Sequence, residues 1–343
     1  MTLAHQILLA AGQAWPAFVL VAGLLMIGGV AAADGLFEAI GGRLASAPLG
    51  PRGLLLALLG LVAIVTAILN LDTSVVFLTP VLVHAARQRG IDERPYLYGS
   101  VFMANAASLL LPGSNLTNLL VLRADPEHAA TFAGEMAPAW IAACSVTAVF
   151  VATAFRVRDG QVAPGEMPPF RMGAGAVAAA AAAVLVVAVP DAQRSSLAVL
   201  GVGLAATTLR RLEPRVELRV LSALFGLTVA LGTLARLWDA PGRLLVDGGG
   251  AWAAAGVGAL TSIACNNLPA AVLLSARPPA HPQALLVGLD VGPNLAVTGS
   301  LSAFLWLRSA ASVRARVSLA TYSRLGLVLV PMSLALSLAA LRL

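Results

Sequence analysis

Long apolar segments follow one another along the whole chain, and four of them are interrupted midway by polar residues, glycine or proline. The chain is 59% hydrophobic and 11% charged, whereas average soluble domains carry about 25% charged residues. Most segments have the length of about 17–25 residues that a bilayer-spanning helix needs. The sequence therefore predicts an all-α polytopic membrane protein.

Several classes of protein are not indicated. The net charge of +6 comes from arginines between apolar segments, with no basic run interleaved with aromatic residues, so we expect no nucleic-acid partner. Cys144 and Cys265 match neither a disulfide framework nor a metal-ligand spacing. No nucleophile–base pair appears in the sequence, so we do not expect the protein to be an enzyme. We also expect no metal site and no cofactor. The first apolar run, from about Trp15 to Ala33, lacks a cleavage-site pattern and predicts a retained helix.

The segments 53–85 and 249–276 carry polar residues near their middle. Non-helical backbone at membrane depth is tolerated where it is buried in protein or lines a cavity. We therefore expect each segment to form a re-entrant helical hairpin, with Asn70–Ser74 at the first tip and Cys265–Pro269 at the second.

The segments 97–122 and 283–307 contain the breaks Pro112-Gly113 and Gly292-Pro293, which predict discontinuous helices. Continuous helices are expected over the remaining apolar segments, 14–33, 136–156, 173–190, 195–209, 219–237 and 318–341.

The arginines predict an orientation. With both hairpins entering and leaving on one side, fifteen of the 22 arginines fall on one face and six on the other. The arginine-rich face should be cytoplasmic. The prediction is eight crossings and two hairpins in the cell (inner) membrane, with both termini outside. If each hairpin segment instead crossed the membrane twice, the same loops would share a side. The number of arginines on each face would therefore be unchanged. Asp34 and Glu38, at the cytoplasmic end of the first helix, are expected to be solvated.

An internal repeat follows from these segments. Residues 1–156 and 219–343 each hold a helix, a hairpin, a broken helix and a final helix, while 157–218 hold two connecting helices. The first hairpin opens to the cytoplasm and the second to the outside, so the two units are inverted relative to each other. This arrangement is typical of secondary transporters, whose sites lie at the repeat interface.

The candidate site combines the two tips and the two breaks. Asp72 is the expected proton carrier or cation ligand, and a buried structural carboxylate is the alternative. Asp290 precedes the second break and is a second candidate site residue. The alternative for Asp290 is a helix cap or a packing partner. Polar side chains at the breaks could bind substrate or only join helices. The candidate substrate- and ion-binding residues are Asn70, Asp72, Thr73, Ser74, Asn105, Ser114, Asn115, Thr117, Asn118, Asn266, Asn267, Asp290, Asn294 and Thr298.

The two halves predict matched positions. Asn70 pairs with Asn266, and Gly113-Ser114-Asn115-Leu116 pairs with Gly292-Pro293-Asn294-Leu295. Asp72 then falls opposite Leu268, so only one tip carries a titratable group. A single titratable tip suits a proton-coupled carrier.

Four blocks resemble the arsenite permeases, the arsenical-pump membrane proteins of the ion transporter superfamily. They are residues 70–80, 105–118, 263–274 and 288–307. The resemblance implies two inverted repeats around a central site and export of arsenite or antimonite by proton antiport, or with a soluble ATPase subunit. More distant relatives are sodium-coupled dicarboxylate carriers and sodium/proton antiporters. The chain departs from the permeases at Leu71, which separates the tip Asn from the Asp, and at Asn294, where some have Lys.

Three functions stay open. The first is a carrier that exports arsenite or antimonite in exchange for protons. The second is a sodium- or proton-coupled carrier of organic or inorganic anions, including dicarboxylates. The third is the membrane half of an ATP-driven pump, although the chain lacks lysine and hence a phosphate-binding Gly-x-x-x-x-Gly-Lys motif. The expected partners are a small inorganic substrate, H⁺ or Na⁺ and lipid; a homodimer and an ATPase subunit stay open.

Overall fold

The computed structural model describes residues 2–122, 129–155, 173–189, 192–213, 216, 218–238, 240, 243, 245 and 249–342. Residues 156–172, which join the predicted segments 136–156 and 173–190, lie outside the described part of the chain. Regular structure in the described part of the chain is entirely helical, which confirms the predicted class. The longer helices and the helices around the breaks are α1 (Leu3–Ala33), α2 (Leu36–Ser46), α3 (Pro51–Ile68), α4 (Leu71–Gln88), α5 (Arg94–Ala107), η1 (Pro112–Ser114), α6 (Leu116–Val121), α7 (Ala129–Ala154), α8 (Ala174–Ala188), α9 (Ala192–Leu209), α10 (Leu218–Leu237), α12 (Ala251–Cys265), α13 (Asn267–Leu274), α14 (Pro282–Val291), η2 (Gly292–Leu295), η3 (Val297–Gly299), α15 (Leu301–Ser312) and α16 (Leu319–Ala340).

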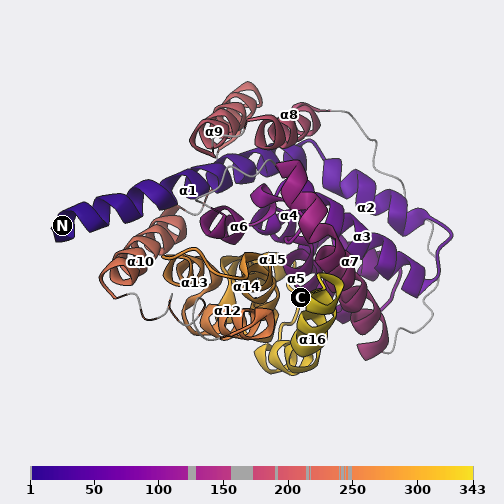
Figure 1. Cartoon of the computed structure of the whole chain (residues 1–343). Helices are drawn as coiled ribbons and strands as arrows, with labels where there is room; N and C mark the ends of the chain where they lie inside the picture. The colour runs from indigo at the N-terminus through magenta and orange to yellow at the C-terminus, as the bar shows by residue number, and fades with distance from the viewer. Residues whose placement is uncertain are drawn as a thin grey trace.

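Helix α1 is a long helix that lies between two groups of helices. Helices α8 and α9 pack on one side of it, and α10, α4 and α6 pack against it from the main bundle (Figure 1). At 31 residues, α1 begins well before the expected start at residue 14. Both predicted connecting helices therefore lie outside the bundle that contains the candidate site.

Asp34 was expected to be solvated, and this was wrong. Its side chain is only 4% exposed and forms an ion pair with Arg210 at 2.5 Å. It also accepts a hydrogen bond from the Gly175 backbone N–H at 2.8 Å. A buried carboxylate needs such partners, and here they join the end of α1 to α8 and α9.

Both hairpin segments break where the sequence predicts. Helix α3 ends at Ile68 and α4 begins at Leu71, with Asn70 between them. Helix α12 ends at Cys265 and α13 begins at Asn267, with Asn266 between them. The two arms of each segment pack against each other. An Asn at the break can cap the following helix with its side chain, which helps to restart it.

Both broken helices are present as well. The first consists of α5, the short helix η1 and α6, and the second of α14, η2, η3 and α15. Each break contains the proline that the sequence offered, Pro112 or Pro293. Proline has no N–H to donate, so the α-helical hydrogen bonding cannot continue through it.

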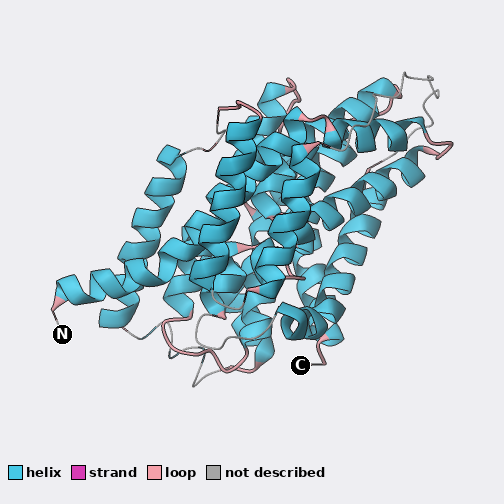
Figure 2. Ribbon diagram, turned by 90° about the horizontal axis from the view of Figure 1, so that it is seen from above, coloured by secondary structure: helices cyan, strands magenta, loops and turns pink. Residues whose placement is uncertain are grey.

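The unbroken helices alone do not test the prediction of eight crossings, because two of those crossings are the broken helices. Five helices in the described residues are long and apolar enough to do so: α1, α3, α7, α10 and α16. Helix α8 is shorter, with 15 residues, and α9 begins with the polar run Gln193–Ser196. Each broken helix is divided into pieces that are shorter than a single membrane-spanning helix, so neither is among the five. Both chain ends lie along the same side of the molecule in Figure 2.

Two large buried clusters hold the bundle together, one mainly from α1–α5 and one mainly from α1, α6, α7 and α12–α15. Close helix contact is possible where glycine removes the side chain. A Cβ at Gly288 of α14 would lie 2.1 Å from the Ala255 carbonyl oxygen of α12. This packing fixes α14, and with it the second break, against the arm of the second hairpin.

Candidate functional site

The first residues of four helices line one small cavity in the interior of the protein. Each of α4, α6, α13 and α15 starts at one of the four breaks in the apolar segments. The cavity is lined by Leu71, Asp72, Asn115, Leu116, Asn267, Leu268, Ser300, Leu301 and Ser302. The structure thus brings both tips and both broken helices to a single place, as the candidate site requires.

A polar side chain caps each of the four helices. Asn70 accepts from the Thr73 N–H at 2.7 Å and Asn266 from the Leu268 N–H at 3.3 Å. Asn115 and Ser300 do the same at the two broken helices, at 3.3 and 3.2 Å. Asn70 and Asn266, which the sequence pairs, thus have the same capping role. Asn266 has a φ of +76°, a conformation that Asn tolerates better than most residues.

Asp290 is the centre of a buried hydrogen-bond cluster. Its carboxylate accepts from Asn115 Nδ2 at 2.9 Å, from Ser108 Oγ at 3.3 Å and from the Thr117 hydroxyl. The donors come from the first broken helix and Asp290 from the second, and Asp290 is fully buried. Three donors explain how a carboxylate persists at this depth, because each compensates for lost hydration. Asp290 joins the two halves.

Asp72 has the opposite environment. It is 7% exposed, and its carboxylate has no hydrogen-bond or charged partner among the described residues. Three further buried atoms near this tip also lack a partner in the described part of the chain: Thr66 Oγ1, Thr73 Oγ1 and Asn70 Nδ2. Buried polar atoms are normally paired, so this tip retains capacity to bind a proton, a cation or a polar group.

A second bridge between the halves lies behind the cavity. Asn105 Nδ2 donates to Asn294 Oδ1 at 2.7 Å, and Asn294 Nδ2 donates to the Phe102 carbonyl at 3.2 Å. The Tyr322 hydroxyl donates to the Pro293 carbonyl at 3.0 Å. These bonds hold η2 between α5 and α16. Asn105 and Asn294 are buried but do not line the cavity.

Some candidate residues stabilise the breaks. Ser114 Oγ donates to the Ser108 carbonyl at 2.5 Å, and Asn118 Nδ2 donates to the same carbonyl at 2.9 Å. Ser74 Oγ donates across the first hairpin to the Val62 carbonyl at 3.4 Å. Thr298 is exposed and donates to the Ile263 carbonyl at 3.0 Å. These side chains bind backbone carbonyls rather than facing the cavity.

The expected match of Asn115 with Asn294 is wrong. Asn115 caps α6, but Asn294 lies within η2, and the corresponding helix start in the second half is Ser300. The second break is longer because η3 follows η2. Ser300 and Ser302 line the cavity and Ser108 binds Asp290, yet none was among the candidates. A serine directly before the apolar run 301–307 is a helix-start signal that could have identified Ser300.

A family comparison adds to this geometry. Residues 1–292 match the model of the family described as "CitMHS: Citrate transporter". The chain belongs to this citrate transporter family. The match covers both hairpins and the first broken helix and ends within the second break. It makes the chain a membrane transport protein and is consistent with the expectation that it is not an enzyme.

The fold is similar to that of a solved transporter. The crystal structure of the Alcanivorax borkumensis YdaH transporter, described as having an unusual topology, aligns with a TM-score of 0.58 and 15% identity. The alignment covers 98% of this chain and 87% of that chain. At this identity the likeness concerns the fold alone. Among curated proteins, none matches the sequence.

These findings favour one of the three functions considered from the sequence. The citrate transporter family is of the ion-transporter type. Belonging to it does not indicate an arsenite permease. Export of arsenite or antimonite, a soluble ATPase subunit and a homodimer gain no support from the comparisons. The anion carrier agrees best with the family.

Proposed function

We propose that this citrate transporter family member is a secondary carrier of small carboxylate anions, coupled to a proton or another cation. The observation that carries the proposal is the convergence of four helix starts on one buried cavity that also contains Asp72. Helix N-termini offer free N–H groups and the positive end of the helix dipole, and both favour anions. Three of the four helices have eight or more residues: α4, α13 and α15.

The charges near the cavity supply the reason for coupling. No Arg of the described residues lines it, whereas Asp72 does and Asp290 binds Asn115, which also lines it. A carboxylate substrate would therefore enter a region that already contains two acidic side chains. Burying several negative charges together is unfavourable unless protons or cations accompany them. We assign this compensation to Asp72, because it has no partner among the described residues, and propose it as the proton carrier.

The two bridges between the halves suggest how the site could alternate. Asp290 with its three donors, and Asn105 with Asn294, hold residues of both predicted repeats next to the cavity. Inverted repeats that share a central site move against each other in many carriers. We propose that residues 1–156 and 219–343 move in this way, with substrate held where they meet.

Uptake into proteoliposomes tests the proposal. The purified protein would be given radiolabelled citrate, succinate or arsenite under an imposed proton or sodium gradient. We expect gradient-dependent accumulation of a carboxylate and none of arsenite. Accumulation of arsenite but of no carboxylate would overturn the proposal, and equal carboxylate uptake without any gradient would exclude coupling. Liposomes without the protein serve as the inactive control.

A further inference from the structure

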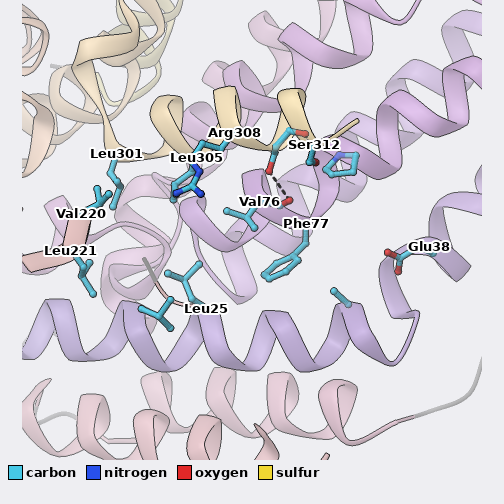
Figure 3. Close-up of a pocket in the computed structure, with 14 residues that line it drawn as sticks. Leu25, Glu38, Val76, Phe77, Val220, Leu221, Leu301, Leu305, Arg308 and Ser312 are labelled. Carbon is cyan, nitrogen blue, oxygen red and sulfur yellow. Dashed lines mark hydrogen bonds between the residues drawn. The ribbon is translucent and has the colours of Figure 1, made fainter. Parts of the chain in front are cut away.

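Two cavities beside α15 differ in the polar groups that they offer to a ligand. The larger, of about 350 Å³, lies mainly between α1, α4, α10 and α15 and has largely apolar walls (Figure 3). Its Ser309 hydroxyl already donates to the Val76 carbonyl at 2.9 Å. The small cavity with Asp72, at the four helix starts, instead has side chains whose donors and acceptors are not all used. The small cavity is therefore the place where a polar group of a ligand can be recognised.

Asp72 supplies an acceptor. Its side chain lines the small cavity, is 7% exposed and has no hydrogen-bond or charged partner among the described residues. Its carboxylate oxygens are not among the fully enclosed polar atoms that lack a partner, so they keep accessible surface. An ionised carboxylate accepts hydrogen bonds and donates none. A ligand group beside Asp72 must therefore bring a hydrogen atom or a positive charge.

Asn267 and a pair of serines supply donors. Asn267 is 2% exposed, lines the same cavity, and its amide has no partner among the described residues. Ser300 Oγ and Ser302 Oγ lie 2.7 Å apart, and Ser300 Oγ also accepts from the Ala303 N–H at 3.2 Å. The pair has two hydroxyl hydrogens and uses one of them between its members. The N–H groups of Asn267 and one serine O–H thus remain for a ligand.

A carboxylic acid group matches these donors and this acceptor better than an ionised carboxylate does. Its C=O can accept from Asn267 or from the serine pair, while its O–H donates to Asp72. An ionised carboxylate could use the same donors, but it would add a second negative charge beside Asp72 with no hydrogen between the two. Two carboxyl groups that share one proton avoid this repulsion.

We propose that each substrate molecule is carried with one proton, held between Asp72 and one carboxyl group of the substrate. The inference rests on the proposed function and deepens it, since it assumes that the cargo is a carboxylate. A substrate carboxylate, one proton from the side of entry and the ionised Asp72 assemble as R–COOH···⁻OOC–Asp72. Only the O–H bond forms on binding and breaks on release. Coupling then follows from recognition, because the proton and the substrate each make the other's binding favourable.

The size of the small cavity limits what binds in this conformation. Its volume is about 10 Å³, the space of about one water molecule. One carboxyl oxygen fits there, between Asp72 and the donors, whereas the rest of a citrate does not. Binding of the whole substrate therefore requires the two repeats to separate at the cavity, which agrees with the movement proposed above.

Other charged groups do not take the place of the shared proton. Asp290 hydrogen-bonds to one residue of the cavity, but its carboxylate is already engaged by three donors. On α4 itself, His84 and Arg87 lie more than three turns from Asp72. Helices α6 and α13, which also line the cavity, carry no charged residue. The charged or titratable residues of the helices packed against α4 do not line it; they are His5, Glu38, Arg43, Arg52, Arg94 and Arg308.

Calorimetry of citrate binding to the purified protein in detergent tests the shared proton. Titrations at one pH in phosphate and in Tris give the number of protons taken up, because the two buffers differ in ionisation enthalpy. We expect the wild type to take up about one proton per citrate and Asp72→Asn to take up none. The amide of the variant can donate directly to an ionised carboxylate, so citrate should bind at least as tightly as to the wild type.

The outcomes separate this inference from the proposed function. Citrate binding by the wild type without proton uptake, or equal uptake by Asp72→Asn, would overturn the shared proton and leave the carrier function standing. Loss of citrate binding by an Asp72→Asn protein that melts like the wild type would do the same. If the wild type binds neither citrate nor succinate, the proposed function fails, and this inference fails with it.

A second variant tests the donors without changing Asp72. We expect Asn267→Ala to weaken citrate binding about fivefold, as loss of one hydrogen bond would, and to leave the proton uptake at the wild-type value. Gln283→Ala is the matched control, because it removes a half-buried amide that donates to Glu135 outside the cavity. Unchanged affinity in Asn267→Ala, or an equal loss in Gln283→Ala, would overturn the role of Asn267 as a donor to the substrate.

Discussion

Two buried carboxylates show that the same residue type can have different roles in one protein. Asp290 is satisfied by three donors from the other half, whereas Asp72 has no partner among the described residues. The first is suited to holding the two halves together. The second is suited to a charge that changes during transport.

Asp72→Asn should therefore preserve the fold and abolish coupling. The amide is nearly the same size as the carboxylate and removes an unpartnered buried charge, so we expect a melting temperature equal to or above that of the wild type. Gradient-driven accumulation should be lost, because the amide cannot carry a proton. Uptake measured with and without a proton gradient checks this. Wild-type accumulation by this variant would remove Asp72 from the mechanism.

Asp290→Ala should have the opposite profile. It leaves the donors of Asn115, Ser108 and Thr117 without their acceptor, and we expect the free energy of unfolding to fall by about 2–3 kcal/mol. Asp92→Ala is a control at an exposed ion pair with Arg94, where the loss should stay below about 1 kcal/mol. Thermal unfolding in detergent compares the two. Similar losses in both variants would contradict the central role of Asp290.

At the scale of helices, the second break depends on its close contact with α16. A Cβ at Gly326 would lie 2.1 Å from the Asn294 carbonyl oxygen and 2.8 Å from the Leu295 Cα. These are backbone atoms, which cannot move aside as a flexible side chain can. The position of η2, and with it the bridge from Asn294 to Asn105, is set by a residue that does not touch the cavity.

Gly326→Ala is thus expected to reduce both stability and transport, by separating α16 from η2. Gly256→Ala is the matched control, because Gly256 lies within α12 and a Cβ there would meet nothing within 4 Å. The control should gain up to about 1 kcal/mol from higher helix propensity. Melting temperature and citrate uptake report on both variants. Normal uptake by Gly326→Ala would mean that η2 can shift without affecting the site.

At the scale of the whole molecule, both ends of the chain lie on the same side in Figure 2. The arginine distribution predicts that the termini face outward. We expect tags at both termini to be cleaved by protease in spheroplasts and protected in inverted vesicles. A cysteine at the exposed position Arg316, in a background without the two native cysteines, should label only in inverted vesicles. Termini on opposite sides would contradict the topology.

Much of the helical organisation could be predicted from local sequence. The breaks at Asn70, Pro112, Asn266 and Pro293 were found because proline and polar residues within apolar runs interrupt helices for local reasons. The number of crossings stays a prediction, because the five long apolar helices in the described residues do not include the two broken helices.

The sequence by itself determined that this is a helical membrane protein with four interrupted segments, because hydropathy and helix breaking depend on neighbouring residues. Only the tertiary structure decided which polar residues meet. Ser300, Ser302 and Ser108 join the site, while Ser114, Asn118 and Thr298 bind backbone. The partners of Asp290 lie more than 170 positions away in the chain. Contacts over such separations depend on how the helices pack, and no local pattern specifies that.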